Sequence, residues 1–181
     1  DQSNSEIKLR FLSNTSNSSM YDKEAQTEYT NPSEEDFDIQ NILFYNKVSG
    51  ETFPLLSDTL HILSFAIHNE FKKPLIFYRI AKRDINGDGK YNSKDPVMFC
   101  ISDSEGKNLV NVTPDNEQFV SYFYYKETNT ILVKTAIDAN NDKKFNSFDE
   151  TTFREVKLDN PAVGREIFTQ QLIDKLKLQL R

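Results

Sequence analysis

Residues 78–95 (YRIAKRDINGDGKYNSKD) align without gaps with residues 132–149 (LVKTAIDANNDKKFNSFD). Each run opens on apolar, aromatic or β-branched residues, which favour a β-strand, and ends in a loop rich in Asp and Asn. Another apolar run follows each loop, at residues 97–102 and 152–158. The repeated unit is therefore a strand, an acidic loop and a second strand, which predicts antiparallel pairing across each loop.

The regions on both sides of the repeat continue this pattern. Short apolar runs alternate with turn residues such as Val48-Ser49-Gly50 and Ser104-Glu105-Gly106. We therefore predict a mainly β fold, an antiparallel meander of about nine strands. Their predicted ranges are 41–47, 51–56, 62–68, 74–82, 97–102, 108–113, 119–126, 131–137 and 152–158.

The two ends of the chain differ from this central β domain, which we place at residues 37–159. Residues 1–36 are rich in Ser, Asn, Thr and Glu, with one short apolar alternation from Ile7 to Phe11. This composition predicts a polar N-terminal tail or tether, unless its own domain or a partner holds it. Residues 160–181 change to a helical period and begin with the capping pair Asn160-Pro161. One amphipathic C-terminal helix is predicted, packed on a sheet or, alternatively, docked in a partner's groove.

Composition narrows the class of protein. The 181 residues carry a formal charge of −6 and a pI near 5.0, which disfavours a nucleic-acid partner. The single cysteine, Cys100, lies in the apolar run MFCIS and is expected to be a buried hydrophobic residue. No run of residues reaches the length of a membrane span. We expect an exported chain, with membrane association only through a lipid anchor on a cysteine preceding Asp1.

The first acidic loop, residues 84–95 (DINGDGKYNSKD), has the spacing of a twelve-residue EF-hand-type calcium loop. Calcium takes six to eight hard oxygen ligands, and such a loop supplies them at positions 1, 3, 5, 7, 9 and 12. Gly89 occupies position 6, where the sharp turn needs a positive φ. The predicted ligands are the side chains of Asp84, Asn86, Asp88, Asn92 and Asp95 and the carbonyl of Lys90.

The second acidic loop repeats these ligand types with one departure. Lys143 replaces glycine at position 6, so the turn costs more. The second loop is therefore expected to be a weaker calcium site or, alternatively, a structural relic of one. Aspartate at position 12 of both loops shortens the reach and favours the affinity of extracellular modules, about 10⁻⁴–10⁻³ M. The predicted ligands are Asp138, Asn140, Asp142, the carbonyl of Lys144, Asn146 and Asp149.

The first loop resembles the calcium loop of dockerin modules, which share the DxNxDGxxNxxD arrangement. Dockerin loops lead into helices, whereas residues 97–102 and 152–158 favour strands, so cohesin docking is not expected.

A second family resemblance covers about residues 41–158. It depends on the sequence ISDSEGKNLVNVTP at residues 101–114. This run is similar to the outer part of a blade in TolB-like β-propellers of the bacterial cell envelope. The resemblance implies two propeller-blade-like sheets, too few to close a ring.

These features predict a non-catalytic, calcium-binding accessory or structural subunit of a bacterial cell-envelope complex, in the periplasm or at the outer-membrane surface, with protein partners. The alternative is a calcium-dependent carbohydrate-binding module. It would use the aromatic run Tyr122, Phe123, Tyr124 and Tyr125, of which one alternating pair is expected in the core. No nucleophile–base motif predicts an enzyme. A cytosolic calcium sensor is disfavoured because no predicted helices flank the loops.

Overall fold

The computed structural model describes residues 39–58, 60–85, 87–92, 94–138, 140, 142, 144–145 and 149–179, except the side chains of residues 170 and 177, together with the backbone of residues 7–13. The described residues form eleven β-strands and one helix. The prediction of a mainly β fold, built from antiparallel meanders and ending in a helix, is confirmed.

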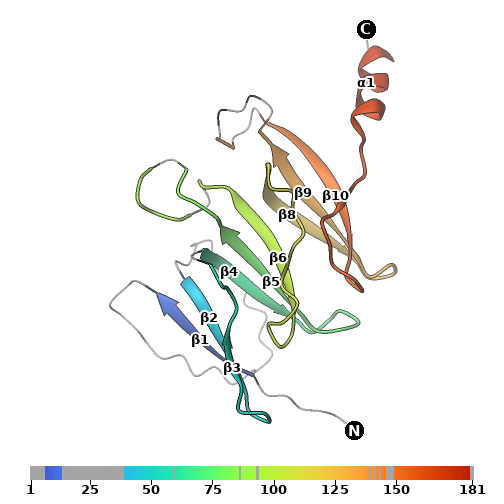
Figure 1. Ribbon diagram of the computed structural model, residues 1–181. Helices are drawn as coiled ribbons and strands as arrows, with labels where there is room; N and C mark the ends of the chain where they lie inside the picture. The colour runs from blue at the N-terminus through green and yellow to red at the C-terminus, as the bar shows by residue number, and fades with distance from the viewer. Residues whose placement is uncertain are drawn as a thin grey trace.

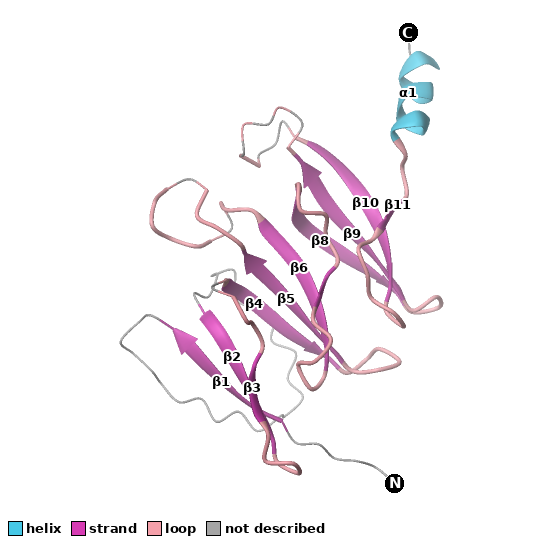
Figure 2. Ribbon diagram, viewed as in Figure 1, coloured by secondary structure: helices cyan, strands magenta, loops and turns pink. Residues whose placement is uncertain are grey.

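The strands belong to two antiparallel sheets (Figure 2). The first sheet contains β1 (Ile7–Ser13), β2 (Ile39–Asn46), β3 (Thr52–Pro54), β4 (His61–His68), β5 (Leu75–Ala81), β6 (Val97–Asp103) and β7 (Val110–Asn111). The second contains β8 (Glu117–Tyr125), β9 (Thr130–Ile137), β10 (Glu150–Lys157) and β11 (Arg165–Glu166). Helix α1 (Gln170–Gln179) follows β11.

The first sheet divides into two layers because only one residue pair, Ile39 with Ile62, joins β2 to β4. The strands β1, β2 and β3 are therefore free to fold over one face of β4–β7, and three layers follow one another along the chain (Figure 1). We call β1–β3 the first layer, β4–β7 the middle layer and β8–β11 the last layer.

The middle layer is buried on both faces. Alternate residues of β5 and β6 enter two different cores, because successive side chains of a strand point to opposite faces. The core against the first layer contains Ile42, Phe44, Ile62, Ile76, Tyr78, Ile80, Met98 and Cys100. The larger core against the last layer contains Leu63, Phe77, Phe99, Ile101, Phe119, Ile131, Val133 and Val156.

Part of the segment predicted as a polar tail lies in the first layer. The strand Ile7–Ser13 pairs antiparallel with β2 along its whole length, with an irregularity between Leu12 and Ser13. The alternation of Ile7, Leu9 and Phe11 is the sequence signal for this strand. The rest of residues 1–36 lies outside the described residues.

The helix begins later in the chain than Asn160-Pro161 suggested. Residues 157–160 form a turn instead, and Arg165 and Glu166 pair with β10 as the fourth strand of the last layer. Strand pairing therefore outweighs the local capping signal, and the helix starts after Thr169. Within the described residues, no helix has the length and hydrophobicity needed to cross a membrane.

The cysteine is buried in the middle layer, as its apolar neighbours predicted. Cys100 is 3% exposed, and burial raises the pKa of its thiol from an ordinary value of 9.0 to about 12. Because only the thiolate attacks disulfides, this shift lowers its reactive fraction about a thousandfold at pH 8. We expect an aromatic disulfide reagent to leave the native protein unlabelled at pH 8 and to label it at once in denaturant.

The same shift has a defined effect on stability. The unfolded thiol begins to lose its proton near pH 9.0, whereas the folded thiol keeps it to about pH 12. The contribution of Cys100 to the free energy of unfolding is therefore complete below pH 9.0 and is lost between these two values. The variant Cys100→Ala is the blank for the labelling assay. Rapid labelling of the native wild-type protein would contradict the buried position.

Candidate calcium loops

The loop between β5 and β6 winds around the carboxylate of Asp84. Its Oδ1 accepts the backbone N–H of Gly87 at 2.7 Å, and its Oδ2 accepts that of Gly89 at 2.7 Å. Both glycines have positive φ, 70° and 75°, a conformation that residues with a Cβ adopt only at a cost. The glycines therefore let the backbone turn so that its amide groups point at the first predicted ligand.

Asp95 closes the loop from its other end. Its side chain is fully buried, and its two oxygens accept the N–H groups of Ile85 at 2.9 Å and Asn92 at 3.1 Å. Between the two ends, Asp88 Oδ1 accepts the N–H of Lys90 at 2.9 Å. Hydrogen bonds to ionised carboxylates are stronger than neutral ones, so the fold of this loop depends on its aspartates.

An aromatic contact anchors the first loop to the middle layer. The ring of Tyr91 lies parallel to the imidazole of His61, with 3.4 Å between ring centroids and 4° between planes. His61 is buried at the start of β4, and Tyr91 also packs against the larger core. The first loop is therefore in direct contact with the core through Tyr91.

The donor groups of the first loop suit calcium. Carboxylate, amide and backbone carbonyl oxygens are hard ligands, and an ionised carboxylate has about four lone-pair sites. Among the described residues of the loop, Asp84 and Asp95 each accept two hydrogen bonds, fewer than their lone-pair sites allow. Among the residues that the structure describes, no three His, Cys, Asp or Glu side chains gather as a metal cluster. The predicted ligand Asn86 lies outside the described residues.

The second loop, between β9 and β10, shows part of the same winding. The N–H of Asp142 is accepted by Asp138 Oδ1 at 3.1 Å and Asn140 Oδ1 at 3.0 Å, and Asp142 Oδ1 accepts the N–H of Lys144 at 2.8 Å. Asp149 immediately precedes β10. Asn146, the remaining predicted ligand, lies outside the described residues, as does Lys143.

The two loops occupy equivalent places in successive layers. The first joins the second and third strands of the middle layer, and the second joins the second and third strands of the last layer. Both project from the same end of the stack (Figure 1). The repeat recognised in the sequence is therefore a repeat of position as well as of residue type.

A buried ion pair that sequence reasoning missed joins β8 to β10. The Arg154 guanidinium donates from Nε, at 2.6 Å, and from Nη2 to the carboxylate of Glu117. Thr135 on β9 donates its hydroxyl to the same carboxylate at 2.6 Å. Glu117 raises the pKa of Arg154 mainly through these hydrogen bonds. No local motif signals this pair, because its members lie far apart in the chain.

A second missed constellation links the middle and last layers. Tyr122 and His68 Nε2 lie at hydrogen-bond distance, 3.2 Å, and His68 Nδ1 lies 2.6 Å from a carboxylate oxygen of Glu70. Burial raises the pKa of Tyr122 above its ordinary value. His68 also packs against Phe77 in the larger core. These contacts link strands of the middle and last layers.

The aromatic strand β8 separates into an inner and an outer pair, as its alternation predicted. Tyr122 and Tyr124 pack against the larger core. Phe123 and Tyr125 point away from it and are 53% and 47% exposed. The second pair is therefore the more exposed of the two, because Tyr122 and Tyr124 are partly buried.

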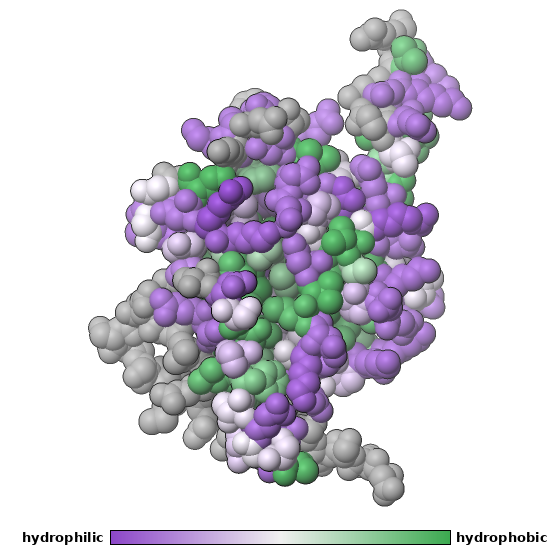
Figure 3. All heavy atoms as spheres, in the orientation of Figure 1, coloured by the Kyte–Doolittle hydropathy of each residue, from purple (hydrophilic) through white to green (hydrophobic). Residues whose placement is uncertain are grey.

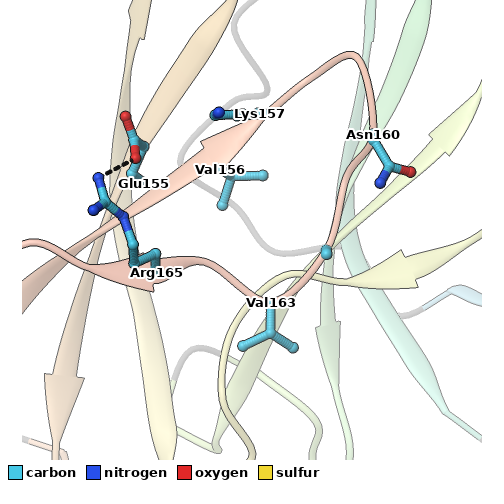
Figure 4. A pocket seen from close by; sticks show the side chains of 7 residues that line it. Glu155, Val156, Lys157, Asn160, Val163 and Arg165 are labelled. Carbon is cyan, nitrogen blue, oxygen red and sulfur yellow. Dashed lines mark hydrogen bonds and ion pairs between the residues drawn. The ribbon is translucent and has the colours of Figure 1, made fainter.

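An open depression of about 500 Å³ lies beside β10 and β11 (Figure 4). Glu155 and Arg165 form an ion pair of 2.7 Å at its edge, and Val156 and Val163 supply apolar surface. Lys157 and Asn160 add polar groups to its lining.

No protein-family model, no curated protein and no solved structure matches this chain. Function is therefore inferred from the loops and surfaces of this chain.

Proposed function

We propose that this chain is a non-catalytic, calcium-binding structural subunit, with one ion in the loop at residues 84–95 and a second, weaker site at residues 138–149. The observation that carries the proposal is the winding of the first loop around Asp84, closed by the buried Asp95. An ion bound by the oxygen ligands of this loop would fix the turn between β5 and β6.

A structural role suits the setting of both loops better than a signalling role. Each loop is flanked by strands that are already paired, so no helices are placed to open a groove when the ion binds. The stack of Tyr91 on His61 connects the first loop with the core, so binding would stabilise the domain as a whole. The short aspartates at position 12 support an affinity suited to a calcium-rich exterior.

The wider proposal places this domain outside the cytoplasm, as an accessory protein of a bacterial cell-envelope assembly. Its support is the affinity expected of the loops and the resemblance of residues 101–114 to an envelope propeller blade. Binding of protein partners is supported by the apolar surface that the last layer and helix α1 leave exposed. The acidic balance of the chain supports partners other than nucleic acid.

Calcium should raise the stability of the wild-type chain. At a calcium concentration about a hundred times the dissociation constant, the free energy of unfolding should rise by about 2.7 kcal/mol, because the ion binds only the folded loop. Thermal melts in calcium and in chelator measure this change, and titration calorimetry counts the sites. Asp84→Asn should remove most of the stabilisation, whereas Asp138→Asn should remove only the weaker event.

The matched control is Asp58→Asn, which alters an exposed aspartate outside both loops and should keep the full calcium response. Magnesium is the control ion, because it requires a tighter octahedral shell than this loop offers. Absence of both heat and a melting shift with calcium would overturn the proposal. If calcium stabilised Asp84→Asn as much as the wild type, the ion would bind elsewhere in the chain.

The alternative, a calcium-dependent carbohydrate-binding module, is supported by the exposure of Phe123 and Tyr125. The ring of Phe123 is inclined by 41° to that of Phe153, which is inclined by 83° to Phe168. A flat sugar face stacks best on coplanar rings, so this geometry favours an apolar occupant. Binding to immobilised glycans that chelator abolishes would favour the alternative.

A further inference from the structure

The outer face of the last layer carries an apolar groove that no described residue covers. The groove has a volume of about 300 Å³. Its lining residues, which define the outer groove, are Phe123, Tyr125, Leu132, Phe153, Ile167 and Phe168. Phe168 is 46% exposed, like its neighbours Phe123 and Tyr125, so three aromatic rings meet solvent here. A contiguous patch of this kind commonly marks a site of protein association.

The C-terminal helix carries a matching apolar stripe. Leu172 and Leu176 lie one turn apart on α1 and are 43% and 51% exposed, and Ile173 lies beside them. The helix extends away from the three layers (Figures 1 and 2), and hydrophobic and hydrophilic residues share its surface (Figure 3). The chain therefore bears both an apolar groove and an apolar helix stripe.

The start of helix α1 is fixed by Thr169. Its hydroxyl accepts the N–H of Leu172 at 3.4 Å, and its carbonyl accepts the N–H groups of Leu172 at 2.9 Å and Ile173 at 3.1 Å. Phe168 and Ile173 hold the two positions of a hydrophobic staple, which sets the direction in which the chain enters a helix. Because Phe168 lines the groove itself, the helix leaves from the groove's own edge.

We propose that two copies of this chain associate by exchange of their C-terminal helices, with the stripe of each α1 seated in the outer groove of the other. An amphipathic helix in an apolar groove uses anchors spaced as Leu172, Ile173 and Leu176 are. The exchange is reciprocal, so a two-fold dimer closes and leaves neither surface uncovered. It shares no residue with the calcium loops, so it does not depend on calcium binding, but it assigns a second copy of this chain to the apolar surface that supports partner binding.

The exposed area is sufficient for such a dimer. Two leucines of the stripe and three aromatic residues of the groove are each about half exposed. With about 200 Å² for a large apolar side chain, they offer roughly 500 Å² per copy. The pair would bury roughly 1,000 Å² from these residues alone, at the lower limit for a specific interface. The dimer is therefore expected to dissociate on dilution.

Sedimentation velocity of the full chain at several concentrations tests the proposal. The wild type should change from monomer to dimer as its concentration rises. The groove variant Phe123→Ser and the helix variant carrying Leu172→Ser and Leu176→Ser should each weaken self-association at least about tenfold. The control Leu178→Ser alters a leucine that is 70% exposed and lies off the stripe, and it should dimerise like the wild type. Unchanged melting curves would show that the variants fold.

Mixing the groove variant with the helix variant distinguishes the helix-exchanged dimer from other modes of dimerisation. The groove variant keeps a sound helix and the helix variant keeps a sound groove, so their mixture should recover heterodimer through one intact helix–groove contact. A helix-to-helix dimer would instead leave the groove variant dimeric, and a face-to-face dimer would leave the helix variant dimeric. Either result overturns the exchange. A wild-type protein that stays monomeric also overturns the exchange, even if it binds a different protein or a glycan at this face.

Discussion

Replacing Arg154 with alanine should lower the free energy of unfolding by about 3–5 kcal/mol, the cost of leaving a buried charge without its partner. The side chain of Glu117 is 3% exposed and that of Arg154 is 15% exposed. Removal of the guanidinium leaves the Glu117 carboxylate in the interior. Among the described residues, the hydroxyl of Thr135 then remains as its hydrogen-bond donor. Urea unfolding followed by tyrosine fluorescence or circular dichroism measures the loss.

The matched control for this variant lies on the same layer. Arg165 also forms an ion pair, with Glu155 at 2.7 Å, but its side chain is 78% exposed. Arg165→Ala should therefore cost less than about 1 kcal/mol, the usual value of a surface pair. A second variant, with Glu117→Leu and Arg154→Met together, removes both charges and should recover much of the stability. Equal losses in Arg154→Ala and Arg165→Ala would refute the buried pair.

Gly106→Ala should be nearly as damaging, with an expected loss of roughly 2–5 kcal/mol. Gly106 has a φ of 76°, which costs any other residue conformational energy. A Cβ at this position would also overlap the ring of Phe44, which is buried in the core between the first and middle layers. Denaturant midpoints with the slope of each transition give the loss.

Gly50 offers the control that separates the two causes. Its φ is 74°, but a Cβ built on it meets nothing within 4 Å. Gly50→Ala therefore reports the conformational cost alone, about 1–2 kcal/mol. The difference between the two variants measures the collision with Phe44. If both lose the same stability, Gly106 does not approach that ring as closely as the structure shows.

Local patterns in the sequence predicted the strands and the wound loop, because both depend on residues that are close together in the chain. The spacing of Asp84, Asp88 and Asp95 predicted a wound loop, and each of these carboxylates does accept backbone hydrogen bonds within it. The strand pattern predicted the meander, because apolar alternation is a property of a few neighbouring residues. Whether calcium occupies either loop stays a prediction.

Features that depend on distant residues could not be predicted in this way. The pair of Glu117 and Arg154 and the contact of Gly106 with Phe44 exist only because particular strands pack together. Periodicity shows that β5 is apolar on both faces, but not which layers cover those faces. At Asn160 the local signal pointed to a helix, yet pairing of Arg165 with Glu155 on β10 prevailed.

Because the middle layer is buried on both faces, its folding depends on the order in which the chain is synthesised. The ribosome synthesises β4–β7 before β8–β11. The face of the middle layer that carries Phe77 and Phe99 therefore stays exposed until the last layer has been synthesised. During that interval the nascent chain presents an aromatic surface to which a holdase chaperone can bind. This face is covered only when β8–β10 have been made, because Phe119, Ile131, Val133 and Val156 supply the other side of the larger core.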